Sequence, residues 1–192
     1  MADPLLFPVP LLFETERLEL RPYRTSDAPE LHEALLESIA ELREHLWFLP
    51  WVAEEPTLQT AEARCRRAEA NFLIRADLPY LAFSRSTGRL VASAGMHRTD
   101  WSLPRTEVGY WVRTSEAGKG YATEAVLALT NWALVGMKAK RVELVTDEAN
   151  VRSRRLAERC GFHLEGVLHN TMQSPDGQLR HSCIYARLPS TS

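Results

Sequence analysis

Alternating apolar and polar residues divide much of the chain into short strands. Leu18 and Leu20 alternate with charged neighbours, which is typical of a strand with one buried face. The segment Arg85-Ser86-Thr87-Gly88 and the segment Pro175-Asp176-Gly177 have the composition of hairpin turns. We expect strands over residues 17–21, 80–84, 90–97, 106–112, 141–146, 163–169 and 179–187.

Apolar residues three and four positions apart predict helices between these strands. Within residues 121–135, Ala125, Val126, Leu129 and Ala133 fall on one face of a helix. The same spacing predicts helices over residues 28–48, 57–76 and 151–159. The order of elements is strand, helices, three antiparallel strands, helix, strand, helix and a final hairpin. This order predicts an α+β (mixed α/β) fold in which helices cover one central sheet.

Composition narrows the class of protein. The 192 residues suit a single domain over 1–192, and 45% hydrophobic residues suffice for a core. Lysines and arginines number 23 against 25 acidic residues, so no global positive field is present to bind nucleic acid or an anionic membrane surface. Three widely spaced cysteines argue against a disulfide framework and against a cysteine metal cluster. We therefore expect a cytoplasmic protein with no metal, no nucleic-acid partner and no membrane-spanning segment.

A glycine-rich turn precedes the helix predicted over 121–135. With Gly118 and Gly120 in the turn, several backbone amides converge at the positive end of the helix dipole, which suits a phosphate group. The turn lacks the Gly-Lys-Ser/Thr ending of a nucleotide P-loop and the G-x-G-x-x-G spacing of a dinucleotide fold. The pattern therefore disfavours ATP and NAD as ligands.

The window Ala117-Gly118-Lys119-Gly120-Tyr121-Ala122 resembles the acyl-CoA signature Gln/Arg-x-x-Gly-x-Gly/Ala of the GNAT superfamily of N-acetyltransferases, with Ala117 in place of the Gln or Arg. Downstream, Asn150-Val-Arg-Ser153, then Gly161-Phe162 and Glu165-Gly166, are similar to a second family motif. The opening Thr15-Glu-Arg-Leu-Glu-Leu-Arg-Pro22 is similar to the RimJ/RimL-like branch. The resemblance covers about residues 13–187, which leaves residues 1–12 as an N-terminal arm.

This resemblance implies a GNAT-like fold: a twisted, mostly antiparallel sheet of about seven strands, with acyl-CoA in the cleft between the two middle strands. It also implies direct transfer of the acetyl group from acetyl-CoA, as co-substrate, to a primary amine. The RimJ/RimL branch favours a peptide N-terminal amine and a homodimer. Met172 stands where RimL-like enzymes carry a glutamate, so a small amine (a polyamine, amino acid or antibiotic) stays open as acceptor, as does a non-catalytic acyl-CoA-binding module.

The resemblance also assigns site residues. Glu107 is the candidate general base, with an exposed, arginine-paired carboxylate as the alternative; its position depends on a strand bulge that we expect after Trp111. Ser153 is the candidate proton donor to the leaving thiolate, with a simple helix-capping hydroxyl as the alternative. The expected cofactor-binding residues are Trp111, Val112, Arg113, Gly118, Lys119, Gly120, Tyr121, Ala122, Thr123, Asn150 and Ser153.

Some residues stay open between two interpretations. His97 ends a predicted strand beside the expected acceptor cleft, where it could relay a proton or simply be structural. Trp47, Trp51 and Trp101 lie in or beside loops, where they could line the acceptor pocket or anchor the core.

Overall fold

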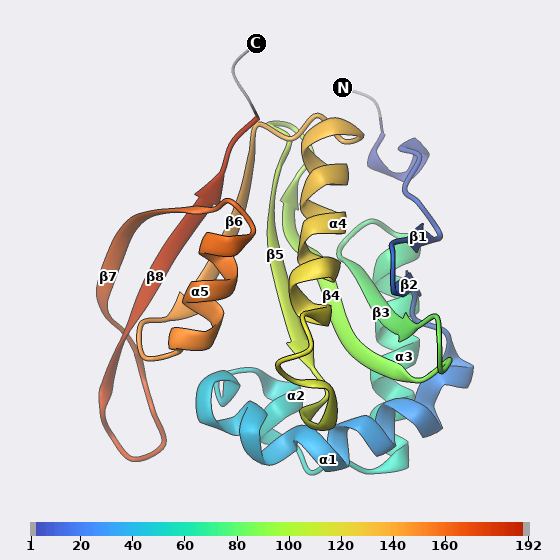
Figure 1. Ribbon diagram of the computed structural model, residues 1–192, viewed down its shortest axis with the longest axis horizontal. Helices are drawn as coiled ribbons and strands as arrows, with labels where there is room; N and C mark the ends of the chain where they lie inside the picture. The colour runs from blue at the N-terminus through green and yellow to red at the C-terminus, as the bar shows by residue number, and fades with distance from the viewer. Residues whose placement is uncertain (1–2, 190–192) are drawn as a thin grey trace.

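One sheet of eight strands organises the protein, in the order β1-β2-β3-β4-β5-β6-β8-β7 (Figure 1). The computed structural model describes residues 3–189. The strands are β1 (Phe13–Glu14), β2 (Leu18–Pro22), β3 (Leu78–Ser84), β4 (Leu90–Asp100), β5 (Arg105–Val112), β6 (Arg141–Asp147), β7 (His163–Gln173) and β8 (Leu179–Arg187). The helices are α1 (Ala28–Leu46), α2 (Pro50–Ala53), α3 (Leu58–Leu73), α4 (Tyr121–Val135) and α5 (Val151–Arg159), with short 3₁₀ turns η1 (Pro4–Leu6), η2 (Thr25–Asp27) and η3 (Thr114–Glu116).

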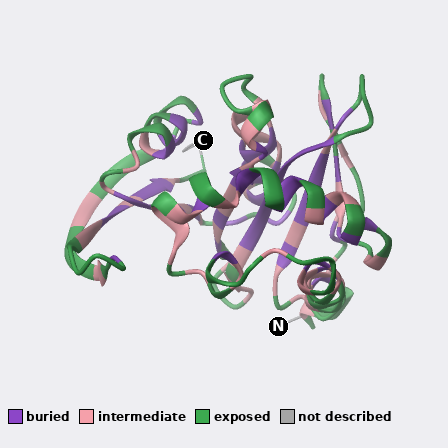
Figure 2. Ribbon diagram, turned by 90° about the horizontal axis from the view of Figure 1, so that it is seen from below, coloured by how far each residue is buried: buried purple, intermediate pink, exposed green. Residues whose placement is uncertain are grey.

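Helices cover both faces of this sheet and divide the core in two. In Figure 1, α4 and α5 lie in front of the sheet, α3 lies behind it and α1 runs along its lower edge. Leu129 of α4 and Leu156 of α5 belong to one buried cluster, while Leu31 of α1, Val52 of α2 and Cys65 of α3 belong to the other. Figure 2 shows the burial concentrated in the strands between these layers. Within residues 3–189, no helix is both long and apolar enough to cross a bilayer.

The strand pairing is antiparallel throughout except between β5 and β6. These two strands run parallel, and their register pairs are Arg105–Arg141, Thr106–Val142 and Glu107–Glu143. Beyond Glu107, β5 continues to Val112 without pairing to β6, while it stays in register with β4. The two middle strands therefore open into a cleft whose apex lies at Glu107, as the resemblance implied.

The strand bulge lies elsewhere than expected. The pairing of β4 with β5 is regular from Ala92–Val112 to His97–Glu107, so the bulge predicted after Trp111 is wrong. The irregularity falls instead in β4, between His97 and Asp100, where Arg98 has a φ of 50°. A bulge re-aims the neighbouring side chains, and here it turns Arg98 toward Glu107 on the next strand.

Three further differences between the predicted and the observed elements are confined to single strands or helices. The sequence predicts about seven strands, and the eighth is β1, whose two residues are too few for a periodic pattern. Strand β7 runs to Gln173, because its register with β8 shifts between Leu168 and Met172 and lets the pairing resume. The helix predicted over residues 28–48 ends at Leu46, and Pro50 starts the separate short helix α2, consistent with the tolerance of proline at a first helical position.

A buried arginine fastens α1 to the loop that follows β5. The Arg113 side chain is 3% exposed and contacts Glu37 at 2.6 Å and Glu33 at 2.5 Å. Glu37 also accepts a hydrogen bond of 2.6 Å from the Ser115 amide. Although burial alone would raise the pKa of Glu37, hydrogen bonds from Ser115 and Arg113 lower it to about 2. The anchor therefore depends on an ionised Glu37.

We predict that Glu37→Gln lowers the free energy of unfolding at pH 7 by about 1.5–3 kcal/mol, the range for a hydrogen bond to a charged group. The pKa of Glu37 is lower in the folded state than the ordinary 4.5, so its stabilisation is present above pH 4.5 and is lost as the pH falls toward 2. Urea unfolding of the wild type and the variant should show a difference that shrinks over this range. Glu41→Gln, at an exposed position of the same helix, is the control, and an equal effect of both variants would contradict the anchor.

Candidate active site

Main-chain amides without acceptors gather at the start of α4. Among residues 3–189, the amides from Gly118 to Thr123 have no hydrogen-bond acceptor, whereas Ala117 and Glu124 on either side are bonded to Thr114 and Gly120 carbonyls. Gly120, the N-cap residue, has a φ of 87° and lacks a capping side chain. Free amides at the positive end of a helix dipole form a site for an anion such as a diphosphate.

Arg17, immediately before β2, forms hydrogen bonds with this turn and with α4. Its guanidinium donates to the Lys119 carbonyl at 2.9 Å and to the Glu124 carboxylate at 2.7 Å. A Cβ on Gly120 would lie 3.2 Å from Nη2 of Arg17. Arg17 therefore holds the outside of the turn in a shape that a side chain at Gly120 would disturb.

The surface beside the turn is hollow and contains positive charge. A depression of about 550 Å³ includes Arg17, Gly120, Thr123 and Arg159 in its lining. Arg159, at the end of α5, donates to the Thr123 hydroxyl at 3.4 Å. The Lys119 ammonium contacts Glu116 at 2.8 Å. An anionic ligand held by the amides of the turn would thus meet guanidinium groups on both sides of α4's first turn.

A free strand edge leads from this turn back to the cleft apex. Residues 108–112 of β5 pair with β4 on one side and, among the described residues, with no strand on the other. At about 3.4 Å per residue this edge is about 17 Å long. Its main-chain amide and carbonyl groups could bind an extended ligand that itself carries amides, in the manner of an added strand.

Ser153 lies on the α5 side of the cleft. Its amide is capped by the Asn150 side-chain oxygen at 3.0 Å, which places Asn150 at the N-cap of α5 and Ser153 in the first turn. The Ser153 side chain adjoins Tyr110 of β5: burial raises the pKa of Tyr110 to about 12, and a hydrogen bond with Ser153 opposes part of this rise. Both hydroxyls are therefore protonated at neutral pH and can donate a proton.

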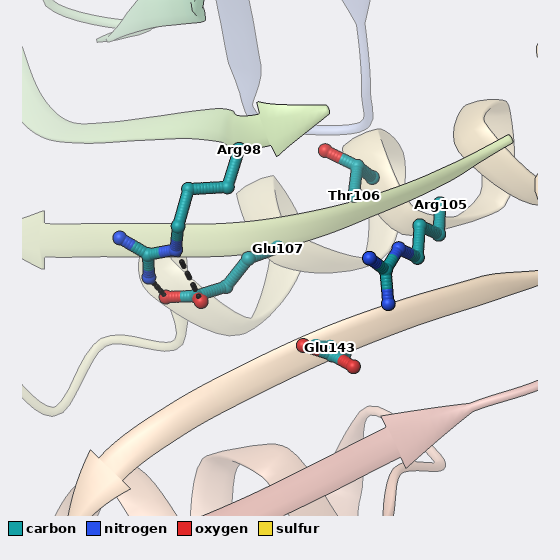
Figure 3. Close-up of a pocket in the computed structure, with 5 residues that line it drawn as sticks. All are labelled: Arg98, Arg105, Thr106, Glu107 and Glu143. Atoms are coloured by element: carbon teal, nitrogen blue, oxygen red, sulfur yellow. Dashed lines mark hydrogen bonds and ion pairs between the residues drawn. The ribbon is translucent and has the colours of Figure 1, made fainter. Parts of the chain in front are cut away.

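Glu107 lies at the cleft apex, on the opposite face from Tyr110. It lines a cavity of about 160 Å³ with Glu143, Arg98, Arg105 and Thr106 (Figure 3). Arg98 contacts both oxygens of the Glu107 carboxylate, one through Nε at 3.0 Å and the other through Nη2. Glu143 approaches from β6 and contacts Arg141 at 2.5 Å. The apex therefore carries carboxylates with a small space between them. Glu107 is paired with an arginine, as its alternative interpretation expects, but its side chain is only 14% exposed.

Apart from Asn150 and Ser153 of α5's first turn, the residues expected to bind cofactor fall into two groups. Those from Gly118 to Thr123 lie together in the turn and the first turn of α4. Trp111 and Arg113 point elsewhere: Trp111 packs in the cluster of α1, α2 and α3, and Arg113 binds carboxylates of α1. Together with Val112, they could serve a ligand only through main-chain groups of β5 and the residue after it.

The three tryptophans for which the sequence leaves two interpretations lie in different parts of the structure. Trp101 packs against Phe7 at 5.3 Å between ring centroids, so it anchors the N-terminal segment. Trp47, after α1, donates to the Gln173 carbonyl at 3.3 Å and so touches the β7–β8 hairpin. Trp51 lies 6.3 Å from Trp111, on the same face of the sheet as Glu107.

Sequence reasoning missed three parts of the site. Tyr110 could have been found from strand alternation, since it points to the face opposite Glu107 and Trp111. Arg17, already inside the opening motif, gives no sign by itself that it reaches Lys119. The partner of His97 is Asp77, whose carboxylate lies 3.2 Å from Nδ1; nothing in the spacing of these two residues indicates the contact.

Known proteins share this architecture. The family described as an acetyltransferase (GNAT) domain matches residues 17–163. A protein of Bacillus subtilis (strain 168) named "Putative ribosomal N-acetyltransferase YdaF" is 29% identical over 179 residues, which cover 90% of this chain and 91% of that protein.

Solved structures agree at the level of the fold. RimL, described as a ribosomal L7/L12 α-N-protein acetyltransferase in complex with coenzyme A, has a TM-score of 0.82 at 22% identity, covering 96% of this chain and 99% of that chain. The microcin C7 self-immunity acetyltransferase MccE, in complex with acetyl-CoA and AMP, has a TM-score of 0.81 at 19% identity, covering 91% and 93%.

Proposed function

We propose, on the premise that this chain belongs to the GNAT family and is an acetyltransferase, that it transfers the acetyl group of acetyl-CoA to the N-terminal amine of a peptide or protein. Membership in a family of enzymes removes the alternative of a non-catalytic binding module. The observation that carries the proposal is the run of free amides from Gly118 to Thr123, joined by a free strand edge to a cleft with carboxylates at its apex.

The free amides and the free edge fit the parts of acetyl-CoA in order. Its diphosphate suits the amides at the start of α4 and the guanidinium groups of Arg17 and Arg159 nearby. Its pantetheine arm carries two amides and can pair with main-chain groups of residues 108–112 as a strand would. The thioester end then falls near the apex, where Glu107 lies. The structural relatives RimL and MccE hold coenzyme A or acetyl-CoA, which supports this placement.

The reaction we propose is direct attack of the amine on the thioester. The neutral amine is the nucleophile, so its ammonium form, with a pKa near ~8 at a peptide N-terminus, must lose a proton first. The carboxylate of Glu107 is on the side from which we expect the amine to approach, and it binds the incoming ammonium group. Ser153, on the other face and beside Tyr110, is placed to protonate the leaving thiolate.

The acceptor assignment has its own support. Carboxylates of Glu107 and Glu143 line a cavity of about 160 Å³, a volume for one amine-bearing end of a molecule. The relative YdaF carries a ribosomal N-acetyltransferase name and RimL is described as acting on L7/L12. We further propose that the enzyme acts in the cytoplasm, where its three cysteines stay reduced, and that it forms a homodimer, which sedimentation velocity would test.

We predict that peptides with a free N-terminus are the preferred acceptors. Free-thiol release should give a kcat/KM at least about tenfold higher for such a peptide than for the same peptide with a blocked N-terminus and a free lysine, because the α-amine has the lower pKa. Spermidine, free amino acids and an aminoglycoside complete the panel. A preference for any of these small amines would contradict the peptide acceptor while leaving the acetyltransferase intact.

We predict that Gly120→Val raises the Kd for acetyl-CoA by at least about tenfold. A β-branched residue is strained at a φ of 87° and its Cβ would meet Arg17, so the turn and its free amides would shift. Isothermal titration calorimetry measures the Kd. Gly88→Val is the matched control, since Gly88 also has a positive φ but lies in the β3–β4 hairpin with nothing within 4 Å. Unchanged affinity in Gly120→Val would place the cofactor elsewhere.

We predict that Ser153→Ala lowers kcat about tenfold, with an unchanged Kd for acetyl-CoA. The loss is modest because a thiolate with a pKa near ~8.5 leaves readily and water can supply the proton. The Asn150 cap bonds the main-chain amide of residue 153, so the variant keeps its helix. Pre-steady-state thiol release is the measurement, and Ser86→Ala in the β3–β4 turn is the control. A wild-type rate would reduce Ser153 to a helix-terminal hydroxyl.

A further inference from the structure

The His97 ring lies over two glycines that face each other on neighbouring strands. Gly95 of β4 and Gly109 of β5 are register partners. A Cβ on Gly95 would lie 2.9 Å from Nε2 of His97, and one on Gly109 would lie 3.2 Å from its Cδ2. Any side chain larger than hydrogen at either position would displace the ring. The imidazole therefore reaches over β5 because both neighbours are glycine.

A carboxylate orients this ring. Asp77, immediately before β3, lies 3.2 Å from Nδ1 of His97. A carboxylate accepts hydrogen bonds, so it favours the neutral tautomer with the proton on Nδ1. That tautomer leaves the lone pair on Nε2, which has no hydrogen-bond partner within residues 3–189. The His97 side chain is 35% exposed, so a ligand can reach it.

The ring also lies at the point where the thioester is expected. His97 is the register partner of Glu107, and Glu107 is the last residue of β5 that pairs with β6. Gly109, under the ring, belongs to the free edge that we assign to the pantetheine arm. An amine that attacks a thioester at the apex from the face of Glu107 would therefore come within reach of Nε2.

The carboxylates around the His97 ring are already paired with other groups, whereas Nε2 is not. Asp77 is engaged with Nδ1, and both oxygens of Glu107 contact Arg98. From β6, Glu143 is paired with Arg141. At the far end of the same face, Arg64 of α3 stacks on Trp51, away from the apex. A paired carboxylate must give up its arginine to take a proton, whereas Nε2 of His97 needs no such exchange.

We infer that His97 is the general base of the acetyl transfer and that Asp77 is its positioning residue. Nε2 takes one proton from the ammonium and later returns it to solvent. The neutral amine then forms the N–C bond, the C–S bond breaks, and as the nitrogen loses its second proton the thiolate gains one. Glu107 holds the incoming ammonium at the apex instead of removing its proton. The inference rests on the proposed acetyl transfer to an amine.

The test compares three variants on the best acceptor of the panel. We expect His97→Gln to lower kcat/KM by about 10²–10⁴-fold, the usual contribution of a general base, with an unchanged Kd for acetyl-CoA. Glu107→Gln should mainly raise the KM for the amine. Asp77→Asn should lower kcat by a smaller factor and move the lower limb of the pH–rate profile, which a purely structural role would not do. His163→Gln, at the exposed start of β7, is the control.

Chemical rescue tests whether the missing group in His97 variants is an imidazole. Added imidazole should restore part of the activity of His97→Ala, because that variant leaves a space over Gly95 and Gly109. A wild-type rate in His97→Gln together with a large loss of kcat in Glu107→Gln would overturn the inference in favour of Glu107.

A second measurement, of which ring nitrogen of His97 carries the proton, does not depend on knowing the acceptor. Long-range ¹H–¹⁵N correlation spectra of the acetyl-CoA-bound enzyme should show His97 with its proton on Nδ1 at neutral pH. A proton on Nε2 would overturn the inference even if no amine of the panel reacts. Absence of turnover with every amine would instead count against the proposed acceptor.

Discussion

The parting of β5 from β6 is the constraint on which the site depends. Main-chain amides and carbonyls inside a sheet need partners, and leaving them unpaired costs free energy unless water or a ligand satisfies them. The pairing of these strands ends at Glu107 and Glu143, although both strands continue. The fold tolerates this opening because β4 and β8 pair with the outer edges of the two strands. The free main-chain edge of β5 therefore stays in place through its regular pairing with β4, next to the free amides at the start of α4.

The position of the glycine turn is set from both sides of the sheet. Arg113 fastens the start of the loop to α1 through Glu33 and Glu37, and Arg17 fastens its end to α4 through Lys119 and Glu124. Both arginines bind carboxylates and carbonyls of the protein itself, so they act through the shape of the loop. A turn with few side chains of its own gains rigidity in this way.

The sequence predicts the parts of this site that are local and misses those that join distant segments. Helical spacing and the glycines of the turn predict α4 and the convergence of amides at its start. The sequence offers a capping role for Ser153, whereas the structure gives the cap to Asn150. No glycine or proline in the sequence indicates the bulge in β4, because the residue with the positive φ is Arg98. The contact of His97 with Asp77 depends on the alignment of β3 with β4, which single-chain periodicity does not determine.

Alternation along β5 and its neighbour β4 places the groups that we propose for the two proton transfers on opposite faces of the sheet. Tyr110 points to the layer of α4 and α5 and meets Ser153 there, while Glu107, Gly109 and Trp111 face the layer of α1, α2 and α3. Successive side chains of a strand point to opposite faces, so a bond broken at its open edge has a donor on one face and an acceptor on the other. Because β5 has no bulge between Glu107 and Val112, this division holds along the whole free edge. The proposed base, His97, and the proposed proton donor, Ser153, therefore lie on opposite sides of the sheet.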